Sequence, residues 1–139
     1  GYGYEDRYAA GGNINVFDAT VIGNGEGTVE VELDTSGTRI IAPHHEAISE
    51  GSRIQIGVRP EKLLISTEAP TGEQYTITRG VVEDLAYYGN RCVYRVRSHT
   101  GRIIQVSAQN YQRSAELLLE WDDEVYLSWD TQCSVVLSE

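Results

Sequence analysis

Residues 51–66, GSRIQIGVRPEKLLIS, form the stretch that decides the fold. Ile54, Ile56 and Val58 recur with a period of two, which is typical of a strand with one buried face. Pro60 has no amide hydrogen to donate to a neighbouring strand, so a central strand cannot continue through it. A short apolar run follows at 63–66. The stretch therefore predicts two strands joined by a corner at Pro60.

The same period of two recurs on both sides of this corner. At 28–34 three apolar residues alternate with acidic ones, and at 91–98 Cys92, Tyr94 and Val96 alternate with a face rich in arginine. The turns are rich in glycine, and GNGEG at 23–27 supplies the positive φ angles of a tight hairpin. Strands are expected at 13–22, 28–34, 38–42, 54–58, 63–66, 75–85, 91–98, 102–108, 124–129 and 133–137.

Roughly ten short strands with regularly spaced turns predict an all-β fold, either a small barrel or a sandwich. The pattern allows at most one short helix, at 109–120. Pro70 and Gly72 mark the best internal boundary, and the order of elements before it is echoed after it. We therefore expect a linker at 1–12, a first β sub-domain at 13–70 and a related second β sub-domain at 71–139.

Composition disfavours several classes of partner. The 139 residues carry a net charge of −10, and nucleic-acid binding depends on cationic side chains that neutralise phosphates, so we expect no nucleic-acid partner. The arginines at 91–102 are expected to form a solvated strand face. No apolar run approaches the ~20 residues needed to cross a bilayer, and nothing has the form of a secretory leader. Because the chain contains no methionine, we expect it to be a fragment of a larger protein.

The sequence lacks the patterns of common catalytic sites. Nucleotide hydrolysis by a P-loop needs a lysine after a glycine-rich turn, whereas the single lysine, Lys62, follows a glutamate. His44, His45 and Glu46 are consecutive, and adjacent side chains on an irregular backbone point apart, so we do not expect them to hold one metal ion. The sequence therefore predicts no catalytic, cofactor-binding or metal-ligating residue, and no enzymatic activity, in this chain.

Two cysteines, Cys92 and Cys133, lie far apart and lack the spacing of a zinc or redox motif. We expect both to be reduced and to act as small apolar residues. A disulfide between them is the alternative, and it would indicate an oxidising compartment.

Arg59 and Glu61 flank Pro60 with opposite charges. We expect them to fasten the corner by an ion pair, which would cost roughly 3–5 kcal/mol to break if it were buried. A direct contact between Arg59 and a ligand is the alternative.

Four segments resemble the TOBE domain that follows the nucleotide-binding domain of many ABC-importer ATPases. They are the start at Gly12–Phe17, GSRIQIGVRPE at 51–61, GVVEDLAYYGNRCVYRV at 80–96 with its Tyr-x-Gly turn, and LSWDTQCSVVL at 127–137. The resemblance covers the chain from Gly12 onward, and the close at Trp129–Asp130 is similar to that of the polyamine-importer branch. The start departs from the family, because Ala10 runs directly into two glycines.

The resemblance implies a small barrel of the oligonucleotide/oligosaccharide-binding (OB-fold-like) type, in two related β sub-units. It implies a non-catalytic regulatory and dimerisation domain of the ATP-binding subunit of a bacterial importer for spermidine or putrescine, peripheral on the cytoplasmic face of the membrane. The implied partners are the ATPase domain of the same chain, a second copy of the subunit and, indirectly, the membrane permease subunits. ATP and Mg²⁺ would bind to the parent ATPase domain, and this chain would hold no cofactor. The structural or regulatory candidates are Arg59, Pro60, Glu61, Tyr88, Gly89, Trp129 and Asp130.

Two other functions stay open at this point. A TOBE module that senses a small oxyanion would need a cation beside hydroxyl groups, for which Arg59, Ser66 and Arg91 are the candidates. A secreted carbohydrate-binding β module would use Trp121, Trp129 or the tyrosines as stacking platforms. This last function predicts a disulfide between the two cysteines and rows of exposed aromatic side chains.

Overall fold

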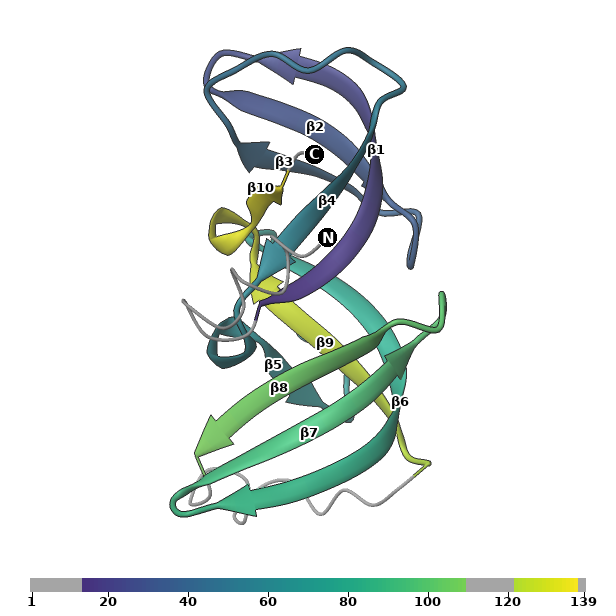
Figure 1. Cartoon of the computed structure of the whole chain (residues 1–139), viewed down its shortest axis with the longest axis vertical. Helices are drawn as coiled ribbons and strands as arrows, with labels where there is room; N and C mark the ends of the chain where they lie inside the picture. Colours follow the sequence, from purple (N-terminus) through teal and green to yellow (C-terminus); the bar gives the residue numbers. More distant parts are fainter. Residues whose placement is uncertain (1–13, 110–121, 138–139) are drawn as a thin grey trace, which may run out of the picture.

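The computed structural model describes residues 14–109 and 122–137, which are mostly strand (Figure 1). Every strand that the pattern predicts is present, with ends shifted by a few residues at most. The strands are β1 (Asn15–Gly25), β2 (Thr28–Leu33), β3 (Arg39–Pro43), β4 (Arg53–Val58), β5 (Leu64–Ser66), β6 (Tyr75–Tyr88), β7 (Arg91–Ser98), β8 (Ile103–Gln109), β9 (Glu124–Asp130) and β10 (Val135–Leu137), and two short 3-10 turns are η1 (Pro60–Lys62) and η2 (Thr131–Cys133). The helix expected at 109–120 lies outside the described residues, apart from Gln109, which ends β8.

The strands form two five-stranded antiparallel sheets. The first has the order β10-β4-β1-β2-β3 and the second has the order β5-β9-β6-β7-β8. In each sheet the two outer strands approach one another, β3 beside β10 and β5 beside β8. Each sheet therefore curls into a small barrel (Figure 1). The expected all-β, OB-fold-like architecture is confirmed.

Two short strands cross between the halves of the chain. β5 comes before residue 70 and pairs with β9 in the second sheet, whereas β10 ends the chain and pairs with β4 in the first sheet. The division into domains at 13–70 and 71–139 stays a prediction, but the pairing shows that each half of the sequence supplies one strand to the other half's sheet.

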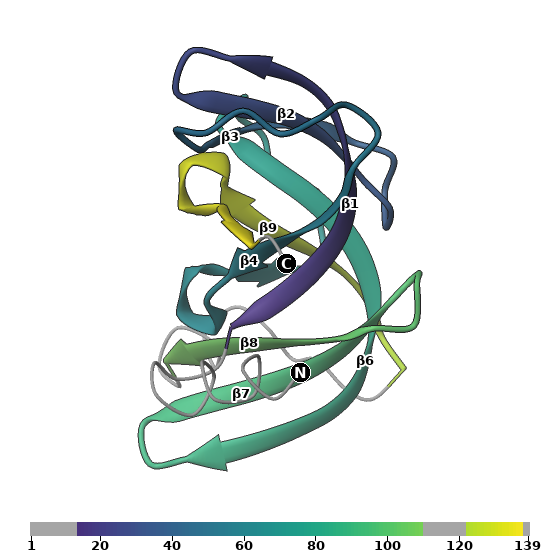
Figure 2. The same ribbon diagram turned by 45° about the horizontal axis from the view of Figure 1, so that its top comes forward.

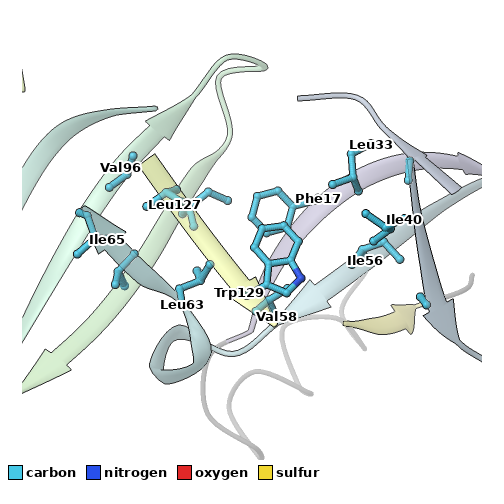
Figure 3. Packing of buried hydrophobic residues seen from close by; sticks show 14 of the residues in the cluster. Phe17, Leu33, Ile40, Ile56, Val58, Leu63, Ile65, Val96, Leu127 and Trp129 are labelled. Atoms are coloured by element: carbon cyan, nitrogen blue, oxygen red, sulfur yellow. The ribbon is translucent and has the colours of Figure 1, made fainter. Parts of the chain in front are cut away.

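A single apolar core fills both barrels. Alternation in sequence becomes alternation in burial, because Val29, Val31 and Leu33 are fully buried while the residues between them are partly exposed. Both sheets contribute side chains to one cluster (Figure 3), whose largest members are Trp129, Tyr94, Phe17, Leu33, Ile56, Ile104 and Leu127. Because this cluster is continuous, the two barrels share one core.

Candidate functional site

Pro60 lies at the corner between the two barrels. It begins η1, it is buried, and the Leu63 amide donates to its carbonyl at 3.3 Å. The fixed φ of proline suits the first position of such a turn, and only Arg59 separates the turn from the end of β4. Arg59 and Glu61 are both exposed. An ion pair between them would therefore be screened by water and worth about 0–1 kcal/mol, well below the value of a buried pair.

Trp129 lies at the centre of the junction between the barrels. Its ring stacks on Phe17 of β1, with centroids 4.8 Å apart and 21° between the planes, and Val58 and Leu63 lie nearby on either side of the corner (Figure 3). Both aromatic side chains are almost fully buried. The indole Nε1 donates to Ser134 Oγ at 2.9 Å. This hydrogen bond gives the N–H group of the buried tryptophan the acceptor that it needs. The structure thus gives Trp129 a position in the core.

Asp130 follows Trp129 and begins the turn η2. Its carboxylate accepts a hydrogen bond from the Gln132 amide at 2.9 Å, which is the contact of an N-capping residue. The turn leads the chain from β9 in the second sheet to β10 in the first. The Trp-Asp pair therefore anchors the chain in the core and then turns it from one barrel into the other.

Asn15 joins the start of β1 to the edge of β8. The Gln105 amide donates to Asn15 Oδ1 at 2.8 Å, and Asn15 Nδ2 donates to the Gln105 carbonyl at 2.7 Å. The carboxamide thus pairs with β8 as a neighbouring strand would, where β1 passes beside β8 (Figure 2). Because an unpaired edge is a template for pairing with another chain, this contact also protects the second barrel.

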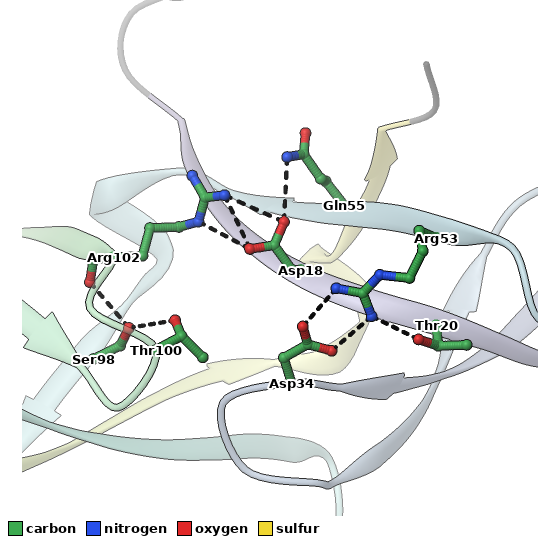
Figure 4. Close-up of polar contacts among 8 residues, drawn as sticks. All are labelled: Asp18, Thr20, Asp34, Arg53, Gln55, Ser98, Thr100 and Arg102. Atoms are coloured by element: carbon green, nitrogen blue, oxygen red, sulfur yellow. Dashed lines mark hydrogen bonds and ion pairs between the residues drawn. The ribbon is translucent and has the colours of Figure 1, made fainter.

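An ion pair bridges the barrels at a second point. Arg102, just before β8, donates to Asp18 Oδ2 from Nη2 at 2.9 Å and from Nε at 3.2 Å (Figure 4). Gln55 Nε2 donates to the same carboxylate at 3.3 Å. The pair is partly exposed, so its contribution is on the order of 1 kcal/mol or less. Because Arg102 donates to the Asp18 carboxylate from both Nε and Nη2, the bidentate ion pair nevertheless fixes the orientation of the β7–β8 turn relative to β1.

Sequence reasoning missed Asn15, Asp18 and Gln105 as junction residues. Arg102 stood out only as one of several arginines in the stretch 91–102. No local pattern marks these residues, because the members of each pair are separated by most of the chain and meet only through the fold.

Tyr88 and Gly89 lie away from this junction, at the tip of the β6–β7 hairpin (Figure 1). Gly89 has a φ of +60°, a conformation that glycine adopts without strain, at the first position of the two-residue turn. Tyr88 is 64% exposed. The sequence candidates therefore divide into two groups: the corner and the Trp-Asp pair lie at the junction, and the hairpin pair does not.

The three oxyanion candidates are not joined by any contact between them in the described residues. Arg91 Nε donates to Ser107 Oγ at 2.7 Å, and Ser66 Oγ donates to the Glu68 carbonyl at 2.7 Å. The strands that carry Ser66 and Arg91 are separated in the sheet by β9 and β6. Within the described ranges, no group of three histidine, cysteine or acidic residues could hold a metal ion.

Two of the features expected of a carbohydrate-binding module are not found in the described residues. No disulfide joins Cys92 to Cys133 in the described residues, so the disulfide alternative is wrong. Trp129 is buried and cannot serve as a stacking platform, and Trp121 lies outside the described residues. In the part of the chain that the structure describes, no helix has the length and apolar character needed to cross a bilayer.

Two curled sheets that exchange strands and share one core define a class of protein, the tandem OB-fold-like β domain. The cytoplasmic molybdate-binding protein ModG, solved with molybdate bound, has the same fold: the TM-score is 0.76, with 90% of this chain and 96% of that chain covered at 15% identity. At that identity the likeness shows the fold alone. The family pattern of the TOBE domain matches residues 56–137, more than half of the chain. The chain therefore belongs to the TOBE domain family.

Several curated relatives cover nearly all of this chain. The putrescine transport ATP-binding protein PotG of Escherichia coli (strain K12) is 29% identical over 135 residues, which are 95% of this chain and 35% of PotG. The spermidine/putrescine import ATP-binding protein PotA of Thermotoga maritima is 30% identical, covering 89% of this chain and 37% of that protein. PotA of Frankia alni is 33% identical, and the match covers 91% of this chain and 27% of that protein. The chain thus spans about a third of the length of these relatives.

Proposed function

We propose that this chain is the accessory, regulatory and dimer-stabilising domain of the ATP-binding subunit of a bacterial ABC importer for polyamines. The observation that carries the proposal is the family match at residues 56–137, together with relatives that are named as ATP-binding proteins for putrescine or spermidine. In this proposal the domain is attached to its ATPase domain and lies on the cytoplasmic side of the membrane, near the permease subunits.

The junction between the barrels supports a mechanical role for this domain. A regulator acts on a motor only by binding one of its conformations better than another. A domain can transmit such a preference if its two parts move together. The stack of Phe17 on Trp129, the carboxamide pairing of Asn15 and the ion pair of Asp18 join the two barrels at three separate points.

The chemistry of the subunit would reside outside this chain. In our proposal ATP and Mg²⁺ bind to the ATPase domain of the parent protein, and this domain holds no cofactor and performs no reaction. A domain of this kind changes the rate of the motor by its contacts, and the acidic net charge of −10 is compatible with protein partners rather than nucleic acid.

The first test is direct. The purified chain is assayed for ATP hydrolysis and, by calorimetry, for binding of ATP, putrescine, molybdate and sulfate. We expect no turnover and no nucleotide binding. Turnover by the isolated chain would overturn the proposal, and saturable binding of molybdate or sulfate would replace it by the oxyanion-sensing function.

The second test uses the parent gene. We expect the region upstream of this chain to encode a nucleotide-binding domain with a P-loop. Uptake of labelled putrescine is then compared between cells that carry the full subunit and cells that carry a subunit truncated before this domain. Unchanged uptake at every external putrescine concentration, with equal amounts of both proteins, would contradict an accessory role.

A further inference from the structure

Asn24 and Gly25 form an exposed pair at the end of the β1–β2 hairpin. Gly25 lies opposite Thr28 across a two-residue turn. Among the asparagines of the chain, Asn24 is the only one that a glycine follows. The pair therefore combines exposure to water with the absence of a side chain at the position after the asparagine.

This arrangement favours deamidation, the loss of ammonia from an asparagine side chain. The backbone nitrogen of the next residue attacks Cγ, the bond from Cγ to Nδ2 breaks, and the proton of the attacking nitrogen leaves with the ammonia. The product is a five-membered succinimide ring, which a water molecule opens to aspartate or to isoaspartate. A side chain on the next residue obstructs the attack, whereas glycine has no Cβ and reaches the required backbone angles most readily.

In the folded chain the Asn24 side chain is bound to another segment. Its Nδ2 donates to the Ile48 carbonyl at 2.7 Å, and its Oδ1 accepts from the Ile48 amide at 2.9 Å. The side chain must leave Ile48 before its Cγ can meet the Gly25 nitrogen. Both hydrogen bonds are exposed, and the ends of hairpins open locally at a low cost in free energy. The contact with Ile48 therefore slows the reaction without preventing it.

The same contact attaches the loop at 44–52, between β3 and β4, to the hairpin. Backbone hydrogen bonds to β1 and to the hairpin turn hold the two ends of this loop, at His44 and at Ser52. Ile48 lies in the middle of the loop, is half-buried and packs against the apolar core. Asn24 thus holds the middle of the loop in place.

We propose that Asn24–Gly25 is a site of spontaneous deamidation, slowed by the contact with Ile48, and that the reaction loosens the 44–52 loop. An ionised aspartate has no hydrogen to donate, so a carboxylate oxygen would face the Ile48 carbonyl oxygen where Nδ2 now lies at 2.7 Å. Isoaspartate also adds one carbon atom to the main chain, which disturbs the pairing of Gly25 with Thr28. Either product adds a negative charge to a chain whose net charge is already −10. This inference is independent of the proposed transport function.

The first test follows deamidation at each asparagine. The folded chain is incubated in mildly alkaline buffer, and samples taken over time are digested and analysed by mass spectrometry, with fragmentation to locate the modified residue. We expect the mass gain of deamidation at Asn24 and none at Asn90 over the same period. Asn90 is the matched control, because it is also exposed at the end of a hairpin but is followed by Arg91.

Two variants separate the reaction from its restraint. Gly25→Ala keeps Asn24 but places a methyl group beside the attacking nitrogen, so deamidation should be at least several-fold slower. The new Cβ would lie 2.6 Å from Thr28 Oγ1, a hydroxyl that can rotate away about χ1. Ile48→Pro removes the amide that donates to Asn24 Oδ1, so deamidation should be faster than in the wild type. Near-UV circular dichroism checks that both variants are folded.

The effect on the loop is measured separately. Asn24→Asp reproduces one product of the reaction, and amide hydrogen exchange at Ile48 should be faster in this variant than in the wild type. Asn90→Asp adds the same charge at the other hairpin and should leave exchange at Ile48 unchanged.

Three results would contradict the proposed site. They are conversion at Asn24 no faster than at Asn90, equal conversion in the wild type and in folded Gly25→Ala, or no conversion in the folded chain by the time that the chain unfolded in urea is fully converted. Exchange at Ile48 that is the same in Asn24→Asp and in the wild type would show that deamidation leaves the loop in place.

Discussion

Phe17 and Trp129 stack face to face with their ring centroids 4.8 Å apart, although one belongs to the first strand of the first barrel and the other to the second barrel. Neither ring can be removed without opening a space that both sheets line. The stack therefore makes the stability of each barrel depend on the other.

Replacement of Trp129 by alanine should destabilise the fold by about 3–5 kcal/mol, because it leaves a large cavity and an unpaired Ser134 hydroxyl. Urea unfolding followed by circular dichroism measures this free energy. The specific contribution of the stack is isolated by a double-mutant cycle with Phe17→Leu and Trp129→Leu, for which we expect a coupling energy of about 0.5–1.5 kcal/mol. A coupling energy near zero would show that the two rings contribute only by burial.

Asn15→Ala should cost about 1–3 kcal/mol, because it leaves the Gln105 amide and carbonyl without their partners at the edge of β8. Amide hydrogen exchange of Gln105 should become faster, since the loss opens that edge. The matched control is Asn24→Ala. Asn24 makes the same pair of contacts with the Ile48 backbone, at 2.7 and 2.9 Å, but it is exposed and lies within the first barrel. We expect the control to cost less and to leave exchange at Gln105 unchanged; equal protection of Gln105 in both variants would refute the edge-capping role.

Gly80→Ala should be more destabilising than Gly57→Ala. A Cβ at Gly80 would lie 2.5 Å from Val96 Cγ1 and 2.8 Å from the Arg97 carbonyl oxygen, which is part of the backbone of β7. A Cβ at Gly57 would meet only the ends of flexible side chains, at 2.7 Å from Ile14 Cδ1 and 3.0 Å from Leu137 Cδ1. Overpacking costs about 1–3 kcal/mol when the surroundings cannot move. Thermal unfolding of the two variants side by side gives the order, and the reverse order would mean that β6 and β7 separate easily.

Stability should fall in acid partly through Asp34. Arg53 donates to both carboxylate oxygens, at 2.9 and 2.6 Å (Figure 4), and these hydrogen bonds hold the pKa of Asp34 below its ordinary value of 3.8, although slight burial opposes them. A carboxyl whose pKa is lower in the folded state stabilises the fold above the pKa of the unfolded state, and this contribution disappears as the pH falls through the folded pKa.

The pair is partly exposed, so its contribution at neutral pH should be about 0.2–1 kcal/mol and should decrease with added salt. The difference in unfolding free energy between the wild type and Asp34→Asn, measured from neutral pH down to the acid transition, should shrink steadily below the ordinary pKa of aspartate. A difference that stays constant over this range would show that Asp34 acts through packing alone.

The strands and their buried faces follow from the sequence because they depend on local alternation. Val29, Val31 and Leu33 on one face, and the proline corner after Val58, are readable without any partner strand, and the structure confirms both. The family could also be recognised, because its motifs lie in short contiguous stretches such as 51–61 and 127–137.

Which strands pair, and therefore where the junction lies, was decided only by the tertiary structure. The sequence by itself determined that β5 and β10 exist, but their short apolar runs fit either sheet, and the exchange that completes both barrels depends on closing long loops around one core. The contacts of Asn15 with Gln105 and of Asp18 with Arg102 arise in the same way. Alternation is a property of neighbours along the chain, whereas the choice of partner is a property of the whole fold.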